Sequence, residues 1–235
     1  MQRRRFLGAL GAAGAAALAG CTGGGTGGDG GSAGRDEPWG LPDHPALAGL
    51  GEQPAIGPEP GEAPALVVGF EDPSCISCQR FERGAFPKLQ SDHVATGELT
   101  FVYRVLPITY PWGRPATQAL ESTYAAAREA GAGRDATAFW GLKDHYYAER
   151  EAFSVDNVYE RTGAYLASET ELDAAAVVEA ARGKRHDDRV TVDTDAAERA
   201  DAVATPTFFL FRDGEFRTTI TGAQSYDVFA SALEL

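Results

Sequence analysis

Two cysteines between an apolar run and a helical pattern constrain the fold of this chain more than any other feature. Residues 65–70 (ALVVGF) are continuously apolar, which is typical of a buried strand. A short polar break follows, and a C-x-x-C motif, CISC at residues 75–78, then begins a helical pattern over residues 75–91. Ser74 is the expected N-cap of this helix, and Pro87 is expected to kink or shorten it.

The spacing of the two cysteines suits thiol chemistry. Cys75 and Cys78 are close enough to form one disulfide across the first helical turn. Cys75 is also expected to lie at the helix N-terminus, where unpaired N–H groups and the helix dipole stabilise a thiolate. A purely structural disulfide and half of a zinc site are the alternatives. Zinc needs a second pair of ligands, and the four histidines show no paired spacing, so we expect no metal.

The rest of the chain predicts one mixed sheet with helices on both faces. Residues 99–106 (LTFVYRVL) form a second predicted strand, which should be parallel to the first because a helix connects the two. Helical patterns fill about 80 residues after it. Residues 207–212 and 215–221 then flank Asp213-Gly214, a strong hairpin signal, and residues 225–233 form a last helix.

Residues 66–78 (LVVGFEDPSCISC) and 203–216 (VATPTFFLFRDGEF) together resemble the DsbA-like branch of the thioredoxin superfamily. The resemblance implies an α/β thioredoxin fold over residues 63–235, with a helical insertion at about 113–185. It also implies that Cys75 exchanges disulfides with a substrate and that Cys78 resolves the mixed disulfide. Pro206 takes the place of the family's cis-proline, and the backbone of Thr205 takes the place that pairs with a substrate strand.

The sequence departs from the family pattern beside the motif. Relatives often carry a buried acid six residues before the first cysteine, where this chain has Gly69. Glu71 and Asp72 are nearby and are candidates for a proton relay, although we expect them to be solvated loop acids. The dipeptide between the cysteines, Ile76-Ser77, lacks the histidine of strongly oxidising members, which predicts a less stabilised thiolate.

The N-terminus predicts export and lipidation. Residues 1–20 combine an Arg-rich start that resembles a twin-arginine signal with a short apolar stretch. Cys21 ends a sequence (LAGC) that resembles a lipobox, so we expect a lipid on its sulfur. Residues 21–62 are rich in Gly and Pro and predict a tether, with a short docking turn at 43–47. These features predict a domain on the outer face of the cytoplasmic membrane, in contact with it through the lipid anchor.

Composition narrows the class of partner. The formal net charge of -13 argues against nucleic acid, whose phosphates require clustered Lys and Arg. Only three lysines occur among 21 basic residues, and this acid-rich, Lys-poor composition resembles that of proteins from high-salt habitats. The composition names neither a substrate nor a redox partner.

The motif, the resemblance and the export signal together predict a membrane-tethered thiol–disulfide oxidoreductase. Its substrates would be exported proteins that contain cysteine, and a membrane redox partner would reset its disulfide. It would need no cofactor besides the Cys75–Cys78 disulfide. A disulfide reductase in an envelope assembly route is the alternative of the same class. A non-catalytic module that binds Cu(I) or a peptide is the alternative of another class.

Overall fold

The computed structural model describes residues 40–235, so the predicted signal, the lipidation site at Cys21 and the first part of the predicted tether, residues 21–39, lie outside the described residues. Five strands form one mixed sheet in the order β1-β3-β2-β4-β5. As predicted, β2 and β3 are parallel and the last two strands are antiparallel, while β4 is antiparallel to β2. The strands are β1 (Ala55–Ile56), β2 (Ala65–Glu71), β3 (Leu99–Val105), β4 (Thr207–Arg212) and β5 (Glu215–Thr221).

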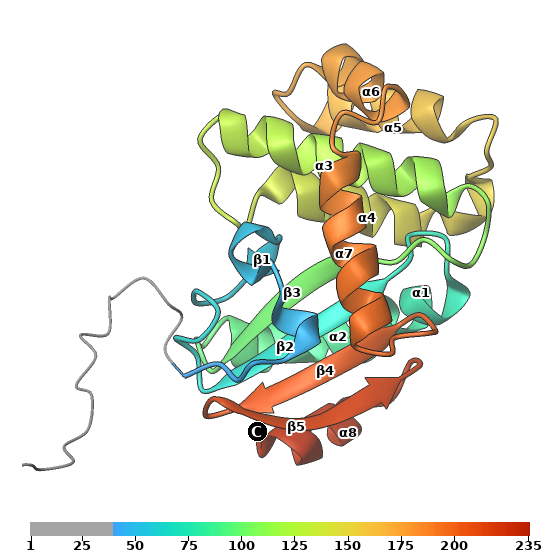
Figure 1. Ribbon diagram of the computed structural model, residues 1–235. Helices are drawn as coiled ribbons and strands as arrows, with labels where there is room; N and C mark the ends of the chain where they lie inside the picture. The colour runs from blue at the N-terminus through green and yellow to red at the C-terminus, as the bar shows by residue number, and fades with distance from the viewer. Residues whose placement is uncertain (1–39) are drawn as a thin grey trace, which may run out of the picture. The chain divides into compact units, whose positions relative to one another are not determined.

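Helices cover both faces of this sheet, as the sequence predicts (Figure 1). The α-helices are α1 (Ile76–Arg83), α2 (Ala85–Leu89), α3 (Gly113–Glu129), α4 (Thr137–Ala148), α5 (Val158–Glu169), α6 (Ala174–Arg182), α7 (Asp187–Arg199) and α8 (Tyr226–Leu233). Four shorter helical segments are η1 (Pro45–Leu47), η2 (Leu50–Glu52), η3 (Gln90–Val94) and η4 (Arg150–Ala152).

The two faces of β2 contribute to two different cores because side chains alternate along a strand. Val67 and its neighbours on the same face pack with α1, α2 and α8. Leu66, Val68 and Phe70 pack on the opposite face with α7 and η1. Every residue of β2 is buried, which explains why its sequence is a continuous apolar run rather than an alternating one.

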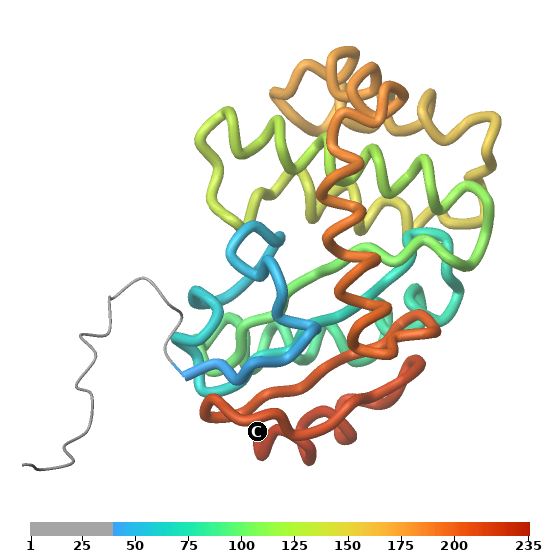
Figure 2. The backbone as a smooth tube through the Cα atoms, viewed as in Figure 1, coloured from blue at the N-terminus to red at the C-terminus, as the bar shows by residue number. Residues whose placement is uncertain are grey.

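The predicted helical insertion is a block of four helices, α3 to α6, beyond one end of the sheet (Figure 1). The tube in Figure 2 shows how the chain leaves β3, builds this block and returns along α7 to the sheet. Trp112, at the start of α3, packs on Tyr146 and Phe153 of the block, with ring centroids 6.1 and 5.3 Å apart. The insertion is therefore anchored next to the C-terminal ends of β2 and β3, where the cysteines lie.

The folded part of the chain begins earlier than residue 63. Residues 41–62, assigned to the tether from their Gly and Pro content, bury Ala46 and Leu50 against the sheet, and β1 pairs with β3. The expected docking turn is the short helix η1, capped by His44. Such a segment has no helical or strand periodicity, and only its contacts with distant residues order it.

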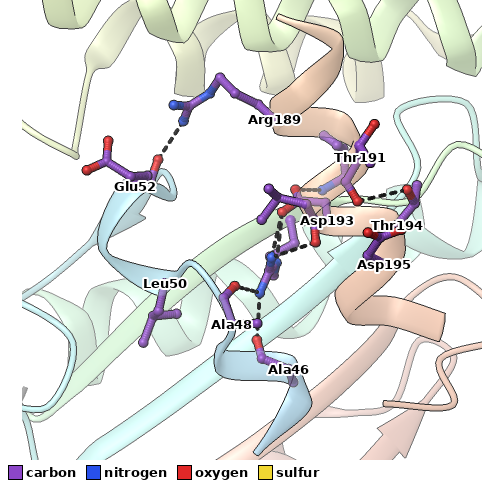
Figure 3. A network of polar contacts seen from close by, with 12 residues as sticks. Ala46, Ala48, Leu50, Glu52, Arg189, Thr191, Asp193, Thr194 and Asp195 are labelled. Carbon is purple, nitrogen blue, oxygen red and sulfur yellow. Dashed lines mark hydrogen bonds and ion pairs between the residues drawn. The ribbon is translucent and has the colours of Figure 1, made fainter. Parts of the chain in front are cut away.

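Arginine side chains hold this segment in place, and Figure 3 shows a hydrogen bond from Arg189 to the carbonyl oxygen of Glu52. Arg104 of β3, fully buried, donates hydrogen bonds of 2.8 Å to the carbonyl oxygens of both Ala46 and Ala48. The same guanidinium pairs with the buried carboxylate of Asp193 in α7 at 2.9 Å. Asp193 also accepts a hydrogen bond from the backbone N–H of Val105. This network connects the N-terminal segment, the sheet and α7.

The predicted helix at 75–91 is interrupted. α1 ends at Arg83, and Gly84, with φ -110° and ψ -89°, separates it from α2. Pro87 lies in the first turn of α2, where a helix does not need its missing N–H group, so the interruption comes three residues before the proline. Ser74 is also not the N-cap: the helix begins after Cys75, and the Ser74 hydroxyl bonds to Asp72 instead.

Candidate active site

The two cysteines lie where β2 passes into α1. Cys75 occupies the N-cap position, and its backbone N–H donates a 2.9 Å hydrogen bond to the carbonyl oxygen of Asp72. The thiols are unbonded, and Cys75 is 4% exposed while Cys78 is completely buried. Cys75 is therefore the thiol that solvent and partners reach first.

The surroundings of Cys75 favour its thiolate. A hydrogen bond from the Cys78 thiol is the main cause that lowers the pKa of Cys75 to about 5, with further bonds from the Thr205 side chain and from the backbone N–H groups of Cys78 and Ser77. These N–H groups belong to the first turn of α1, the helix end that stabilises anions. The site obtains this low pKa without a histidine between the cysteines.

Cys78 has the opposite character. Burial raises its pKa well above the usual value, and the neighbouring Cys75 and Glu71 raise it further. The site thus separates the two thiols into one that ionises readily and one that retains its proton. This difference is the one that an attacking and a resolving thiol require.

The loop between α7 and β4 brings Thr205 and Pro206 to the cysteines. The Cys75 Sγ lies 3.3 Å from the carbonyl oxygen of Thr205, although 130 positions separate the two residues. The Thr205–Pro206 peptide bond is cis, as the family resemblance implied. The structure therefore brings Cys75, Cys78, Thr205 and Pro206 together at one end of the sheet.

Glu71 is not a solvated loop acid. It is the last residue of β2 and is fully buried, and its Oε2 accepts a 3.1 Å hydrogen bond from the Tyr147 hydroxyl. Tyr147 comes from the insertion, and its hydroxyl also lies 3.1 Å from that of Tyr103. Burial raises the pKa of Glu71 well above its usual value. Its Oε1 atom has no hydrogen-bond partner within residues 40–235.

Packing explains why the acid is at position 71 and not at 69. A Cβ atom on Gly69 would lie 3.0 Å from the Phe208 ring and 3.1 Å from the Phe101 ring, so these two side chains occupy the available space. Residues 69 and 71 are on the same face of β2, since side chains alternate. Glu71 therefore faces the same side as an acid at 69 would, one pleat nearer to the cysteines. Strand periodicity was the sequence signal that could have identified it.

Asp72 is also buried, contrary to the expectation of a loop acid. Its Oδ1 accepts hydrogen bonds from the backbone N–H and the hydroxyl of Ser74, at 2.7 and 2.6 Å. Its Oδ2 accepts a 2.7 Å bond from the backbone N–H of Thr109. Both oxygens are therefore occupied by donors from two different loops.

The sequence analysis missed a buried ion pair close to this site. The Lys143 ammonium of α4 lies 2.6 Å from Glu82 of α1, and both side chains are buried. Burial lowers the pKa of Lys143, but the carboxylates of Glu82 and Asp144 outweigh it and raise that pKa. Charged residues on two helices carry no signal that they pair in the interior. The pair connects the helix that bears the cysteines to the insertion.

Two features are absent from residues 40–235. No helix in this part of the chain combines the length and the apolar character of a membrane span. No three His, Cys, Asp or Glu side chains there come close enough together to hold a metal ion.

A family model described as Thioredoxin matches residues 51–234. The chain belongs to the thioredoxin family. Among solved structures, its fold is similar to that of BdbD from Bacillus subtilis, with a TM-score of 0.64 and 23% identity over 78% of this chain and 94% of that one. It is also similar to alpha-DsbA1 from Wolbachia pipientis (TM-score 0.62, 17% identity, 77% and 89% coverage) and to DsbA from Chlamydia trachomatis (0.61, 21%, 76% and 87%). The fold is thus the DsbA-like thioredoxin fold that the sequence predicted.

Two curated proteins resemble this thioredoxin-family chain in sequence. Disulfide bond formation protein D from Bacillus subtilis is 25% identical over 159 residues, which cover 67% of each chain. The Na(+)/H(+) antiporter NhaA 3 from Salinispora tropica is 29% identical over 178 residues. That alignment covers 74% of this chain but only 24% of the antiporter, so the chain corresponds to about a quarter of that longer protein.

Proposed function

We propose that this protein is a thiol–disulfide oxidoreductase that promotes disulfide formation in exported proteins. The observation that carries the proposal is the contrast between its two thiols. Cys75 has a pKa lowered to about 5 at the start of α1, and Cys78 directly behind it has a raised pKa. The DsbA-like fold and the sequence similarity to disulfide bond formation protein D support the same class of activity.

In the oxidising direction the active form contains the Cys75–Cys78 disulfide. A client thiolate attacks the Cys75 sulfur, a mixed disulfide forms, and Cys78 leaves as a thiolate that takes up a proton. A second client thiolate then attacks the client sulfur of the mixed disulfide. This step releases the client disulfide and the Cys75 thiolate, so the client loses two electrons and the enzyme gains them. A membrane redox partner would then reoxidise the pair.

Glu71 is the proposed proton donor and acceptor for Cys78. Its carboxyl group is buried and has a raised pKa, so it holds a proton at a pH where an exposed glutamate does not. The charge of Glu71 also raises the pKa of the Cys78 thiol, and both groups are buried in a poorly screened interior. These properties are those of a group that exchanges a proton with a thiol that cannot reach water.

The proposed location is the outer face of the cytoplasmic membrane. The support comes from the Arg-rich signal, the lipobox at Cys21 and the Gly-rich segment after it, all of which precede residue 40 in the sequence. Replacing Cys21 by alanine should release the protein from the membrane fraction or block its processing. Unchanged membrane fractionation would contradict the lipid anchor.

Trapping of mixed disulfides tests the exchange mechanism. Cys78→Ser removes the resolving thiol, so disulfide-linked complexes through Cys75 should accumulate and should disappear on reduction. Cys75→Ser is the matched control and should trap none. If neither variant carries a linked protein on non-reducing gels, and the wild type does not reduce insulin in a thiol-coupled turbidity assay, the non-catalytic binding module is the better explanation.

The reduction potential of the cysteine pair decides the direction. A stabilised Cys75 thiolate makes the reduced form more stable and the disulfide more oxidising. We therefore expect a potential more positive than the glutathione poise of an oxidising compartment, about -200 mV. The measurement is equilibration with glutathione buffers of known ratio. A clearly more negative value would make the protein a disulfide reductase.

A further inference from the structure

Asp72 connects the loops around the cysteines, and the proposed exchange steps make no use of this connection. Its carboxylate is completely buried, and its oxygens accept three hydrogen bonds of 2.6–2.7 Å. Two of the donors belong to Ser74, immediately before Cys75. The third is the backbone N–H of Thr109, in the loop between β3 and α3. A charged acceptor makes such bonds stronger than those between neutral groups.

Two further contacts make the connection close and directional. The Ser74 hydroxyl, which donates to Asp72, accepts a 3.1 Å hydrogen bond from the backbone N–H of Tyr110. At Gly113 a Cβ atom would lie only 2.5 Å from Asp72 Oδ1, so the chain passes the carboxylate at a distance that only glycine allows. The β3–α3 loop is thus fixed by two backbone N–H groups and by one close approach.

This loop in turn contacts the segment that faces Cys75. The Thr109 hydroxyl lies 3.2 Å from the hydroxyl of Thr205, whose carbonyl oxygen is the one beside the Cys75 Sγ. Ile108 and Tyr110, on either side of Thr109, are 49% and 47% exposed. The position of Asp72 therefore determines where Thr109 contacts Thr205 and where the exposed side chains of its two neighbours in the loop are presented.

We propose that Asp72 is a positioning residue that holds the β3–α3 loop against Thr205 and so maintains the edge to which a client segment binds. This inference rests on the proposed function, because it concerns the same site. It separates the roles of two neighbouring acids. Both oxygens of Asp72 accept hydrogen bonds from the two loops that it connects. Glu71 has an oxygen without a hydrogen-bond partner among residues 40–235 and raises the pKa of the Cys78 thiol, so the proposed proton chemistry belongs to Glu71.

The test is steady-state exchange with an extended cysteine-containing peptide. Asp72→Asn keeps the size of the side chain but replaces one accepting oxygen by an NH₂ group, which cannot accept the bond from Thr109 or from Ser74. We expect the KM for the peptide to rise about tenfold, the effect of losing one hydrogen bond to a charged acceptor. The kcat and the pH at which Cys75 becomes half-alkylated should stay the same.

Two companion variants keep the test decisive. Thr109→Val retains the shape of an exposed residue and removes only the hydroxyl that contacts Thr205, so it should raise KM in the same direction without risk to folding. Asp201→Asn removes an exposed acid from the α7–β4 loop, which carries Thr205, and should leave KM unchanged, which excludes a general charge effect. Hydrogen exchange should also show lost protection at the Thr109 and Tyr110 amides in Asp72→Asn.

The outcomes distinguish this inference from the proposed function. If the wild type and Asp201→Asn exchange no disulfides, the proposed function fails. Retained protection of the Thr109 and Tyr110 amides in Asp72→Asn would then show that Asp72 does not hold the β3–α3 loop either. If the wild type is active and Asp72→Asn has the same KM, only the positioning role is refuted. If Asp72→Asn instead shifts the pH profile of mixed-disulfide resolution at constant KM, Asp72 is a proton relay and the inference is wrong.

Discussion

Replacing Cys78 by alanine should raise the pKa of the Cys75 thiol, whereas replacing it by serine should leave that pKa at about 5. The hydrogen bond from the Cys78 thiol is the largest cause of the low value. Alanine removes this donor, and serine supplies an O–H group in almost the same place. The two variants differ in a single hydrogen bond and resemble each other in that neither can form the disulfide.

The expected size of the effect follows from the strength of that bond. A hydrogen bond to a charged group contributes about 1.5–3 kcal/mol, and one pKa unit corresponds to about 1.4 kcal/mol. Loss of the donor disfavours the thiolate, so the Cys75 pKa in Cys78→Ala should rise by about one to two units. It should stay below the unperturbed value of 9.0, because the Thr205 side chain and the backbone N–H groups of α1 remain.

The assay is the pH dependence of the rate of alkylation by iodoacetamide, supported by the ultraviolet absorbance of the thiolate. The chain has three cysteines, so a variant that lacks Cys78 and is purified without residues 1–21 contains Cys75 as its single thiol. The midpoint of the alkylation profile therefore belongs to Cys75. Equal midpoints in the alanine and serine variants would refute the idea that the Cys78 donor controls the pKa. A midpoint near 9 in both variants would refute the role of the helix N-terminus as well.

Three other results are expected. Glu71→Gln should slow resolution of the mixed disulfide about a hundredfold, as measured by its decay after rapid mixing, because glutamine cannot exchange a proton with Cys78. In urea unfolding of the reduced protein, the free energy of unfolding of the wild type relative to Cys75→Ser should rise with pH between about 5 and 9 and lose this contribution as the pH falls to about 5, because folding lowers the pKa of Cys75 from 9.0; a difference that does not change with pH would contradict the low pKa. Asp193→Ala should destabilise the protein by about 3–5 kcal/mol in the same assay, because it leaves the buried Arg104 unpaired; a loss below about 1 kcal/mol would show that the pair is solvated.

The sequence by itself determined the parts of this protein that short segments encode. The apolar run at 65–70, the C-x-x-C motif and the hairpin at Asp213-Gly214 are short segments, and each predicts its own local structure. Their order predicts the connections of the sheet, because parallel strands need a crossover and a two-residue turn joins antiparallel ones. The structure confirms this topology, including a block of helices between the two halves of the fold.

The boundaries that depend on distant contacts were not predictable in this way. Residues 41–62 have the composition of a linker, and they are ordered by carbonyl oxygens that bind arginines such as Arg104, more than fifty positions further along the chain. The break at Gly84 is similar: the helical pattern continues through it, and the backbone turns where α1 and α2 each pack on the sheet.

Only the tertiary structure decided the chemistry of the acids beside the cysteines. Glu71 and Asp72 are adjacent in the chain and look alike as loop acids. Side-chain alternation along β2 and the contact with Tyr147 of the insertion leave Glu71 buried with a raised pKa. Asp72 instead accepts hydrogen bonds from two different loops. The physical reason is that the environment of a charge depends on which remote side chains exclude water and which donors reach it, and neither is encoded near the residue.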